Sequence, residues 1–187
     1  MKSFAVFVLA ALLAPAAHAQ HQTFTINPDA SQVNMTLNTT HEVVHGTFHI
    51  QSGSIGFDRS APGMSGSVVV LAGSGKTGNG SRDKRMDKEI LQVEQHATVS
   101  FEPRSYAGAI APSADSTIQV TGIFTLLDTP HEITIPMLVH LEGTTATAKA
   151  HFQIPYIQWG LKDPSILFWK ADKTVAIDLS LTGQLSK

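Results

Sequence analysis

Apolar and polar side chains alternate one by one along most of this chain, which is the spacing that a half-buried β-strand requires. Alternation of this kind is typical of an antiparallel sheet with one buried face. We therefore predict about eight strands, joined mostly by hairpins. The predicted strands cover residues 33–39, 46–57, 68–71, 97–101, 118–126, 133–141, 145–154 and 174–182.

A sheet of this length must close into a barrel or fold into a sandwich, because its apolar face has to be covered. On the seventh predicted strand that face carries Ala146, Ala148 and Ala150, whose small side chains leave volume unfilled. An eight-stranded barrel can just hold one small ligand. We predict an all-β fold of about eight antiparallel strands with one short α-helix, and the pattern alone leaves the barrel and the sandwich open. Pro136 lies within a predicted strand and indicates an edge, a bulge or a seam there.

The one predicted helix covers residues 82–91. Ser81 is the expected N-cap, and Asp83 lies in the first turn, where a carboxylate suits the positive end of the helix dipole. Met86 and Ile90 recur at helical spacing and form an apolar stripe. A helix this short is stable only when its stripe is packed. We therefore expect the helix to cover one side or end of the barrel.

The polar residues at the start of this helix, Ser81, Arg82 and Asp83, are assigned a structural role. They follow a loop rich in glycine, serine and threonine, and we expect Arg82 and Asp83 to clamp that loop to the helix. Catalysis by this pair is the less favoured interpretation. Neither a Ser–His–Asp order nor a pair of catalytic carboxylates stands out along the sequence.

Residues 1–19 have the pattern of an export signal. Lys2 precedes the apolar run 4–14, and Ala17-His18-Ala19 fits an A-x-A cleavage site. The apolar run is too short to span a bilayer, and a buried N-terminal helix is the less favoured alternative. We expect cleavage before Gln20. One domain over residues 20–187 would then be released into the periplasm or secreted.

The charge and cysteine content of the chain exclude several classes of partner and site. The 13 basic and 15 acidic side chains give a net charge of −2 with histidine neutral, which is no electrostatic footprint for nucleic acid or an anionic membrane. The sequence contains no cysteine, which excludes disulfides, thiol catalysis and cysteine–zinc sites. The hydrophobic core alone must therefore stabilise the fold.

The apolar face of the predicted strands is the candidate ligand-binding surface. In any β-protein such a face forms a core, so a solid core is the competing interpretation. Methionine side chains on this face could adapt to a flexible apolar chain. The candidate residues are Met35, Leu37, Phe48, Ile50, Phe101, Phe124, Ile135, Met137 and Phe152.

Aromatic and leucine side chains also gather in the connection between the last two predicted strands. This connection is punctuated by proline and glycine, and it could form a lid or mouth over the barrel. A long loop pinned down by its own aromatic side chains explains the pattern equally well. The residues concerned are Tyr156, Trp159, Leu161, Phe168 and Trp169.

Histidine spacing leaves an enzyme as the second hypothesis. His41, His45 and His49 are spaced by four, and a zinc site would need such a cluster with a further ligand. A hydrolase or metal-dependent enzyme could use His41, His45 and His131 at the mouth of the barrel. We favour surface histidines without a metal, because a loop is expected to separate His41 from His49.

Several sequence stretches, taken in order, resemble the YceI-like family of exported bacterial polyisoprenoid-binding proteins. They are SQVNMTL, GTFHIQSGSIGFD, Ser74 and Thr77 ahead of Arg82-Asp83, HATVSFEP, and GIFTL followed by HEITIPMLVHLEG. The resemblance covers essentially the whole chain after the export signal. It implies an extended lipocalin-like barrel that encloses a long isoprenoid lipid. With this resemblance we predict an eight-stranded antiparallel barrel with one short α-helix rather than a sandwich.

The sequence departs from the family pattern in two places. The turn DTPHE stands where the family more usually has a glycine-containing turn, and the stretch PYIQWGLKDPSILFWKAD is more aromatic than the common pattern. These departures leave room for a lipid different from that of the type members, and no individual ligand contact is carried over from the family.

The sequence as a whole predicts an exported, non-enzymatic carrier for a hydrophobic lipid such as a polyprenyl compound or a quinone. No cofactor is expected besides that bound lipid or quinone. The prediction leaves room for a transient contact with a membrane or a membrane protein, excludes nucleic acid as a partner, and favours a monomer over a dimer. The alternatives are the histidine-based enzyme and a solid-cored, stress-related structural domain.

Overall fold

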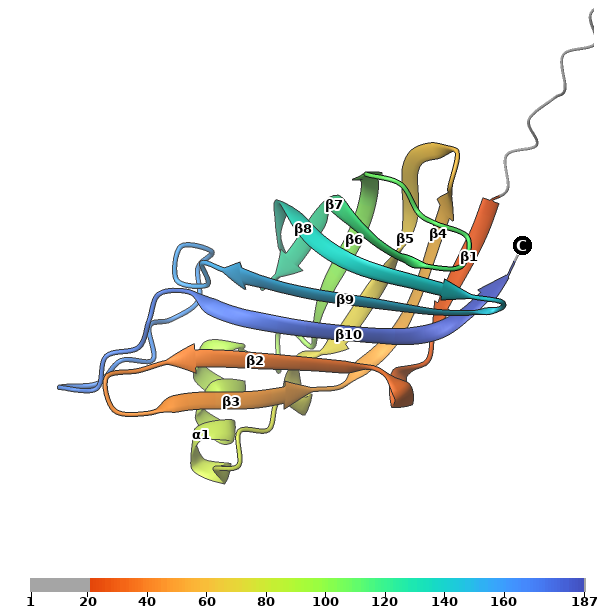
Figure 1. Ribbon diagram of the computed structural model, residues 1–187. Coiled ribbons are helices and arrows are strands. Elements are labelled where there is room, and N and C mark those ends of the chain that lie inside the picture. Colours follow the sequence, from red (N-terminus) through yellow and green to blue (C-terminus); the bar gives the residue numbers. More distant parts are fainter. Residues whose placement is uncertain (1–20, 187) are drawn as a thin grey trace, which may run out of the picture.

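The computed structural model describes residues 21–186, so the predicted export signal at residues 1–19 lies outside the described residues. The described chain forms one antiparallel sheet (Figure 1). Its strands are β1 (His21–Ile26), β2 (Gln32–Asn38), β3 (Val43–Phe48), β4 (Ile50–Asp58), β5 (Ala61–Leu71), β6 (Thr98–Ala107), β7 (Asp115–Leu126), β8 (Thr129–Glu142), β9 (Thr145–Ile154) and β10 (Val175–Ser186).

The sheet closes on itself because β1 pairs with both β4 and β10. Strand β2 lies farther along β10, after the short 3₁₀ helix η1 (Pro28–Ala30), and β3 runs into β4 across His49. The strands β1 and β2 therefore form one interrupted strand, as do β3 and β4. The predicted eight-stranded antiparallel barrel is confirmed. Gly183 is needed at the closing pair, since a Cβ there would lie 2.0 Å from the carbonyl oxygen of Thr25.

Several strands differ from the sequence prediction. Strand β1 was not predicted, although Gln22, Phe24 and Ile26 on its inner face are buried. Strand β5 already begins at Ala61, where a turn was expected. Strand β6 continues past Pro103 because the β6–β7 register shifts between Pro103 and Ser105, and such an irregularity accommodates a residue without an N–H.

Pro136 marks a seam in the barrel wall, one of the alternatives that the sequence left open. It pairs with Gln119 of β7, but the described pairing of β8 with β9 extends only from Met137 to Glu142. Proline has no backbone N–H with which to donate a hydrogen bond to β9, so the β8–β9 ladder ends at this position. Figure 1 shows the two strands diverging beyond it.

The helix covers one end of the barrel but begins differently from the prediction. Helix α1 (Gly80–Arg85) continues as a π-helical turn, η3 (Met86–Ile90), and a second short 3₁₀ element, η2 (Ala72–Ser74), precedes it. The N-cap is Asn79 rather than Ser81, because the Asn79 side chain accepts hydrogen bonds from the backbone N–H groups of Ser81 and Arg82, both at 3.1 Å. None of the helices described in residues 21–186 is long and apolar enough to cross a membrane.

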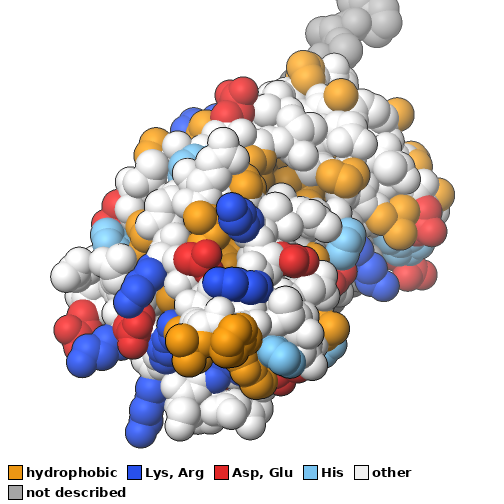
Figure 2. All heavy atoms as spheres, turned by 90° about the vertical axis from the view of Figure 1, so that its left-hand side faces the viewer, with side chains coloured by type: hydrophobic (Ala, Val, Ile, Leu, Met, Phe, Trp, Pro, Cys, Tyr) orange, Lys and Arg blue, Asp and Glu red, His pale blue; other side chains and the backbone are white. Residues whose placement is uncertain are grey.

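The interior contains two hydrophobic clusters. One lies along the barrel and includes Phe57, Val120 and Leu141. The other lies at the helix end, where Ile90 and Leu91 pack with Leu126, Ile154 and Tyr156. The apolar stripe of the helix is thus packed, as its short length requires. The helix end faces the reader in Figure 2, where hydrophobic, acidic and basic side chains lie close together.

Candidate ligand cavity

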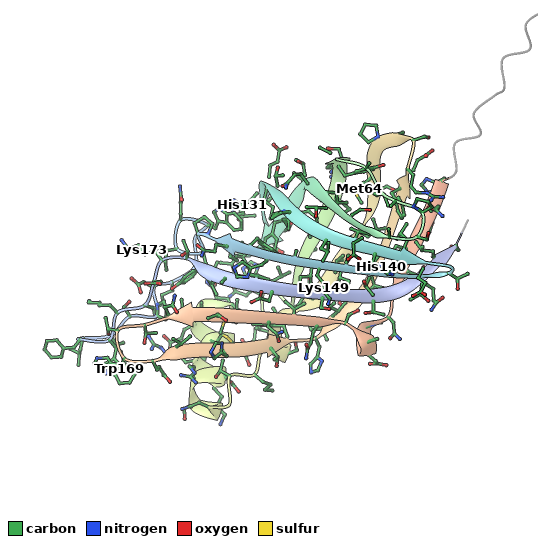
Figure 3. All side chains as sticks on the ribbon, in the orientation of Figure 1. Met64, His131, His140, Lys149, Trp169 and Lys173 are labelled. Carbon is green, nitrogen blue, oxygen red and sulfur yellow. The ribbon has the colours of Figure 1, made fainter. Side chains whose placement is uncertain are left out.

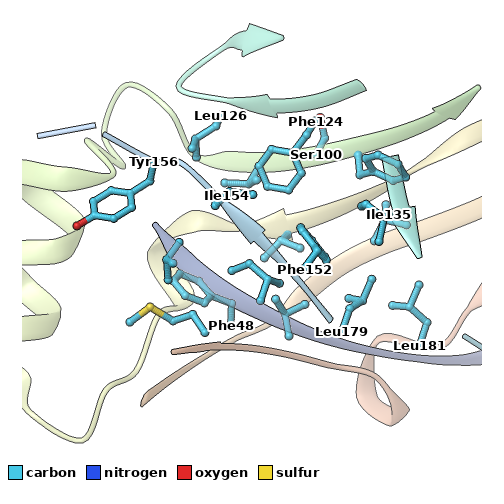
Figure 4. A pocket seen from close by; sticks show the side chains of 18 of the residues that line it. Phe48, Ser100, Phe124, Leu126, Ile135, Phe152, Ile154, Tyr156, Leu179 and Leu181 are labelled. Atoms are coloured by element: carbon cyan, nitrogen blue, oxygen red, sulfur yellow. The ribbon is translucent and has the colours of Figure 1, made fainter. Parts of the chain in front are cut away.

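The barrel encloses a cavity of about 390 Å³, and its lining draws on both hydrophobic clusters. This volume lies within the range of roughly 300–1,000 Å³ that is usual for small-molecule sites. Side chains of several strands point into the common space in Figure 4, among them Phe124, Phe152 and Leu181. The lining is almost entirely apolar over its length. The interior is therefore partly hollow rather than filled.

The predicted apolar face supplies much of the lining. All of its members except Ile50 line the cavity; Ile50 is buried within the surrounding core. Other residues line the cavity that were not among the predicted ones. Some lie on a strand that was not predicted, and others lie on predicted strands. These residues include Phe24, Val33, Ile55, Phe57, Leu179 and Leu181. Period-two alternation identifies most of them, but Ile55 and Phe57 are out of phase with Phe48 because the β4–β5 register shifts between Ile50 and Ser52.

Small side chains on β9 help to keep the cavity open. Ala146 and Ala148 are buried and line it, between Leu141 of β8 and Leu181 of β10 in the sheet order. Larger residues at these inward positions would project into the same space. The volume that alanine leaves therefore contributes to the cavity.

Polar residues line the cavity at its helix end. Thr39, Glu42, Arg82, Arg85 and Lys170 all contribute to the lining there. The Arg82 guanidinium donates to Glu42 Oε1 at 2.6 Å, a distance typical of a charge-assisted hydrogen bond. This end, which we call the mouth, can hold a polar headgroup while the apolar interior holds a chain.

Thr77 joins Arg82 and Asp83 at the mouth. Its hydroxyl donates to Asp83 Oδ1 at 2.6 Å and accepts from Arg82 Nε at 2.9 Å, while its backbone N–H donates to the same carboxylate oxygen at 2.9 Å. These hydrogen bonds, that of the hydroxyl above all, hold the pKa of the Asp83 carboxyl below its ordinary value. The three residues fix the loop before α1 against the helix.

The connection between β9 and β10 contributes several of the predicted lid residues. Tyr156, Leu161 and Trp169 line the cavity, whereas Trp159 and Phe168 do not. The Tyr156 hydroxyl donates to the Asp172 carbonyl at 2.7 Å and so ties the two ends of the connection together. Burial raises the pKa of this phenol to about 12.

Trp159 covers the seam instead of the mouth. Its indole stacks on the ring of His131, and it also contacts Phe124, whose ring centroid lies 5.6 Å away. His131 lies near the end of β8 that diverges from β9 (Figure 3). Its Nε2 atom is buried and has no hydrogen-bond partner within residues 21–186. The aromatic stack thus packs where backbone pairing has ended.

The candidate mouth histidines have separate partners. His41 lies against Trp169, with ring centroids 4.5 Å apart, and His45 Nδ1 lies 3.1 Å from the Thr36 hydroxyl. His131 contacts Trp159. In the described part of the chain, no three histidine or carboxylate side chains come together as metal ligands would. The geometry therefore offers no support for the hypothesis of a histidine-based enzyme.

The YceI-like domain model matches residues 24–183, which is nearly the whole described barrel. The chain belongs to the YceI-like family. No curated protein matches the sequence. The family resemblance that the sequence motifs indicated is thus confirmed, together with the lipocalin-like barrel.

Solved structures of similar fold come from several bacteria. BcnA of Burkholderia cenocepacia has a TM-score of 0.68 and 16% identity, and the match covers 87% of this chain and 99% of that chain. A polyisoprenoid binding domain from Saccharophagus degradans, implicated in plant cell wall breakdown, has a TM-score of 0.67 and 16% identity over 87% of this chain and 98% of that chain. The YceI protein of Campylobacter jejuni has a TM-score of 0.54 and 12% identity over the full length of both chains. At these identities the similarity shows a shared fold.

Proposed function

We propose that this protein binds a long isoprenoid-type lipid, a polyprenyl compound or a quinone, inside the barrel and carries it without changing it chemically. The observation that carries the proposal is the apolar cavity with polar side chains at one end. The similarity in fold to a polyisoprenoid binding domain supports the choice of lipid. The chain acts as an exported monomer in the periplasm or outside the cell, after removal of residues 1–19.

The cavity suits an apolar chain for a simple energetic reason. Each CH₂ group transferred from water to such an environment contributes about 0.8 kcal/mol, so several isoprene units stabilise the complex without any directional contact. The charged side chains of the lining, Glu42, Arg82, Arg85 and Lys170, all lie at the mouth. We therefore place the apolar chain in the interior and the headgroup at the mouth.

The two tryptophans provide a direct test of binding. In a Trp169→Phe variant only Trp159 remains, and it contacts Phe124 of the cavity lining. Titration of this variant with a quinone that carries an isoprenoid tail should quench the Trp159 fluorescence to saturation at one quinone per chain. A quinone of the same ring without the tail is the control and should bind far more weakly. Absence of saturable quenching by the tailed quinone, with no uptake of a polyprenyl alcohol in a separate assay, would contradict the proposal.

A further inference from the structure

A short hairpin projects from the connection between β9 and β10. Ile166 and Trp169 exchange two backbone hydrogen bonds, of 3.0 and 2.8 Å, so that Leu167 and Phe168 form the apex. The side chains at the apex are 85% and 86% exposed, respectively. Figure 1 shows this segment extending away from the barrel at its helix end. We call residues Ile166–Trp169 the apolar tip.

The backbone at the apex makes the choice of residues unusual. Leu167 has a φ of +46°, in the left-handed region that asparagine or glycine adopts more readily. A turn whose only task was to reverse the chain would favour those polar or small residues. Here the chain places a leucine and a phenylalanine in full contact with water. Consecutive exposed apolar side chains of this kind mark a surface that another phase or molecule covers.

The tip is held in place rather than free. The Thr40 hydroxyl, in the turn between β2 and β3, donates to the Phe168 carbonyl at 3.2 Å, and the Thr40 N–H donates to the Lys170 carbonyl at 2.9 Å. The ring of His41 lies against Trp169. A second turn of the barrel thus supports the tip, so its apolar side chains keep a fixed direction away from the protein.

The surroundings of the tip favour a bilayer as its occupant. A convex apolar apex inserts into a fluid phase, whereas a protein partner would have to offer a matching groove. Lys170 and Lys173 follow it in the sequence, where long basic side chains can reach lipid phosphates while the apex lies deeper. Lys162, which precedes it, is already paired with Glu89 at 2.9 Å. Trp169 is half exposed at the base of the tip, a position that tryptophan favours at membrane interfaces.

The tip is also continuous with the cavity. Ile166 and Trp169 form the base of the tip and also line the cavity at its mouth. Figure 3 shows Trp169 beside this projecting segment. We propose that the apolar tip inserts into the boundary between lipid headgroups and acyl chains, so that the mouth faces the bilayer and lipid enters the cavity without crossing bulk water. The direction of lipid entry rests on the proposed function, whereas the docking does not.

Charge has only a modest part in this docking. Asp163 and Asp172 largely offset the three lysines in the same segment. Insertion of the apex residues, Leu167 and Phe168, therefore contributes most of the free energy of membrane binding, and the docking is weak and reversible. We expect binding to vesicles of phosphatidylethanolamine alone as well as to mixtures with phosphatidylglycerol, with a moderate gain from the anionic lipid.

Fluorescence of Trp169 tests the docking directly. In a Trp159→Phe variant Trp169 is the sole tryptophan, and vesicles of phosphatidylethanolamine and phosphatidylglycerol should shift its emission to the blue. Acyl chains brominated near the headgroup should quench it. The double variant Leu167→Asn, Phe168→Ser should weaken vesicle binding by about tenfold or more, and asparagine suits the left-handed backbone. Leu138→Ser, at an exposed apolar residue on β8, is the matched control and should bind as the parent does.

Two results would overturn the docking. One is an unchanged Trp169 emission with vesicles together with no co-flotation of the wild-type protein. The other is self-association that the tip variant abolishes, seen by sedimentation in the absence of lipid, because the tip would then be a contact between copies. Vesicle binding without uptake of quinone or polyprenyl lipid would leave the docking standing and contradict only the proposed function.

Discussion

The imidazole of His131 stacks on the indole of Trp159, with ring centroids 4.2 Å apart and planes inclined by only 5°. Strands β8 and β9 lose their pairing upstream of Met137, so the stack joins two segments that no backbone ladder holds together there. The barrel wall at the seam is therefore closed by side chains. Because Trp159 also contacts Phe124 of the lining, the stack at the seam packs directly against the cavity wall.

We expect Trp159→Ala to lower the free energy of unfolding by about 3 kcal/mol, since a large, partly buried aromatic side chain is removed. His131→Ala should lower the free energy of unfolding by less than Trp159→Ala does. A double-mutant cycle measured by urea denaturation should give a coupling of about 0.5–1.5 kcal/mol between the two rings. Additive effects of the two substitutions would show that the stack does not stabilise the seam.

The cavity can be filled from β9. Ala148→Phe should abolish uptake of the tailed quinone while changing the free energy of unfolding by no more than about 1 kcal/mol, because the new ring occupies empty space. In a solid core the same change would destabilise the protein by about 1–3 kcal/mol. Lys149→Phe, at the exposed neighbouring position, is the control and should retain binding. Equal binding by both variants would place the ligand elsewhere.

The assignment of Asn79 as the N-cap predicts different effects of substitutions at Asn79 and Ser81. Asn79→Ala should destabilise the protein by about 1 kcal/mol, because the backbone N–H groups of Ser81 and Arg82 lose their acceptor. Ser81→Ala should change the stability by less than about 0.5 kcal/mol. Thermal or urea unfolding of both variants measures the difference, and a larger effect at Ser81 would restore it as the cap.

Tyr156 makes the stability of the protein depend on pH in the alkaline range. Its pKa is raised to about 12 in the folded state, so its contribution to stability is fully present below the ordinary value near 10 and is lost as the pH rises toward 12. Tyr156→Phe should cost about 1 kcal/mol at neutral pH through loss of the bond to Asp172. It should also reduce the decline in stability above pH 10. The absorbance of tyrosinate follows the titration, since Tyr106 is the only other tyrosine.

Asp83 makes the stability of the protein depend on pH in the acid range. Hydrogen bonds from Thr77 lower its pKa in the folded state, so its contribution is present above the unfolded value of about 3.9 and disappears as the pH falls through the lowered folded value. Asp83→Asn should flatten the loss of stability in acid, as measured by urea unfolding across pH 2–6. Asp87 is the internal contrast, because burial raises its pKa. Asp87→Asn should therefore not weaken the protein at neutral pH, and a similar acid response in both variants would contradict the assignment.

Period-two alternation was sufficient to predict most of the strands and much of the cavity lining, whereas the choice of a barrel over a sandwich rested on the family resemblance. Alternation works because inward and outward side chains alternate regardless of which strands pair. It could not show which inward residues touch empty space, so Ile50, which packs in the core, was grouped with Phe48 and Phe101.

Features that depend on long-range pairing could not be predicted in the same way. The stack of His131 on Trp159 joins residues whose contact follows from the end of the β8–β9 ladder. The N-cap was misplaced because Asn79 and Ser81 are both favourable cap residues, and only the backbone shows which side chain reaches the free N–H groups. Strand β1 is short and directly follows the predicted export signal, which left little pattern to recognise.

The central claim is that the barrel carries an isoprenoid-type lipid, and native mass spectrometry of the protein purified from its own host tests it most directly. We predict a discrete added mass that solvent extraction removes and that proves to be a quinone or a polyprenyl compound. The Ala148→Phe variant from the same host should show the polypeptide mass alone. A bare polypeptide mass for the wild-type protein, with no uptake of either lipid class on titration, would contradict the account.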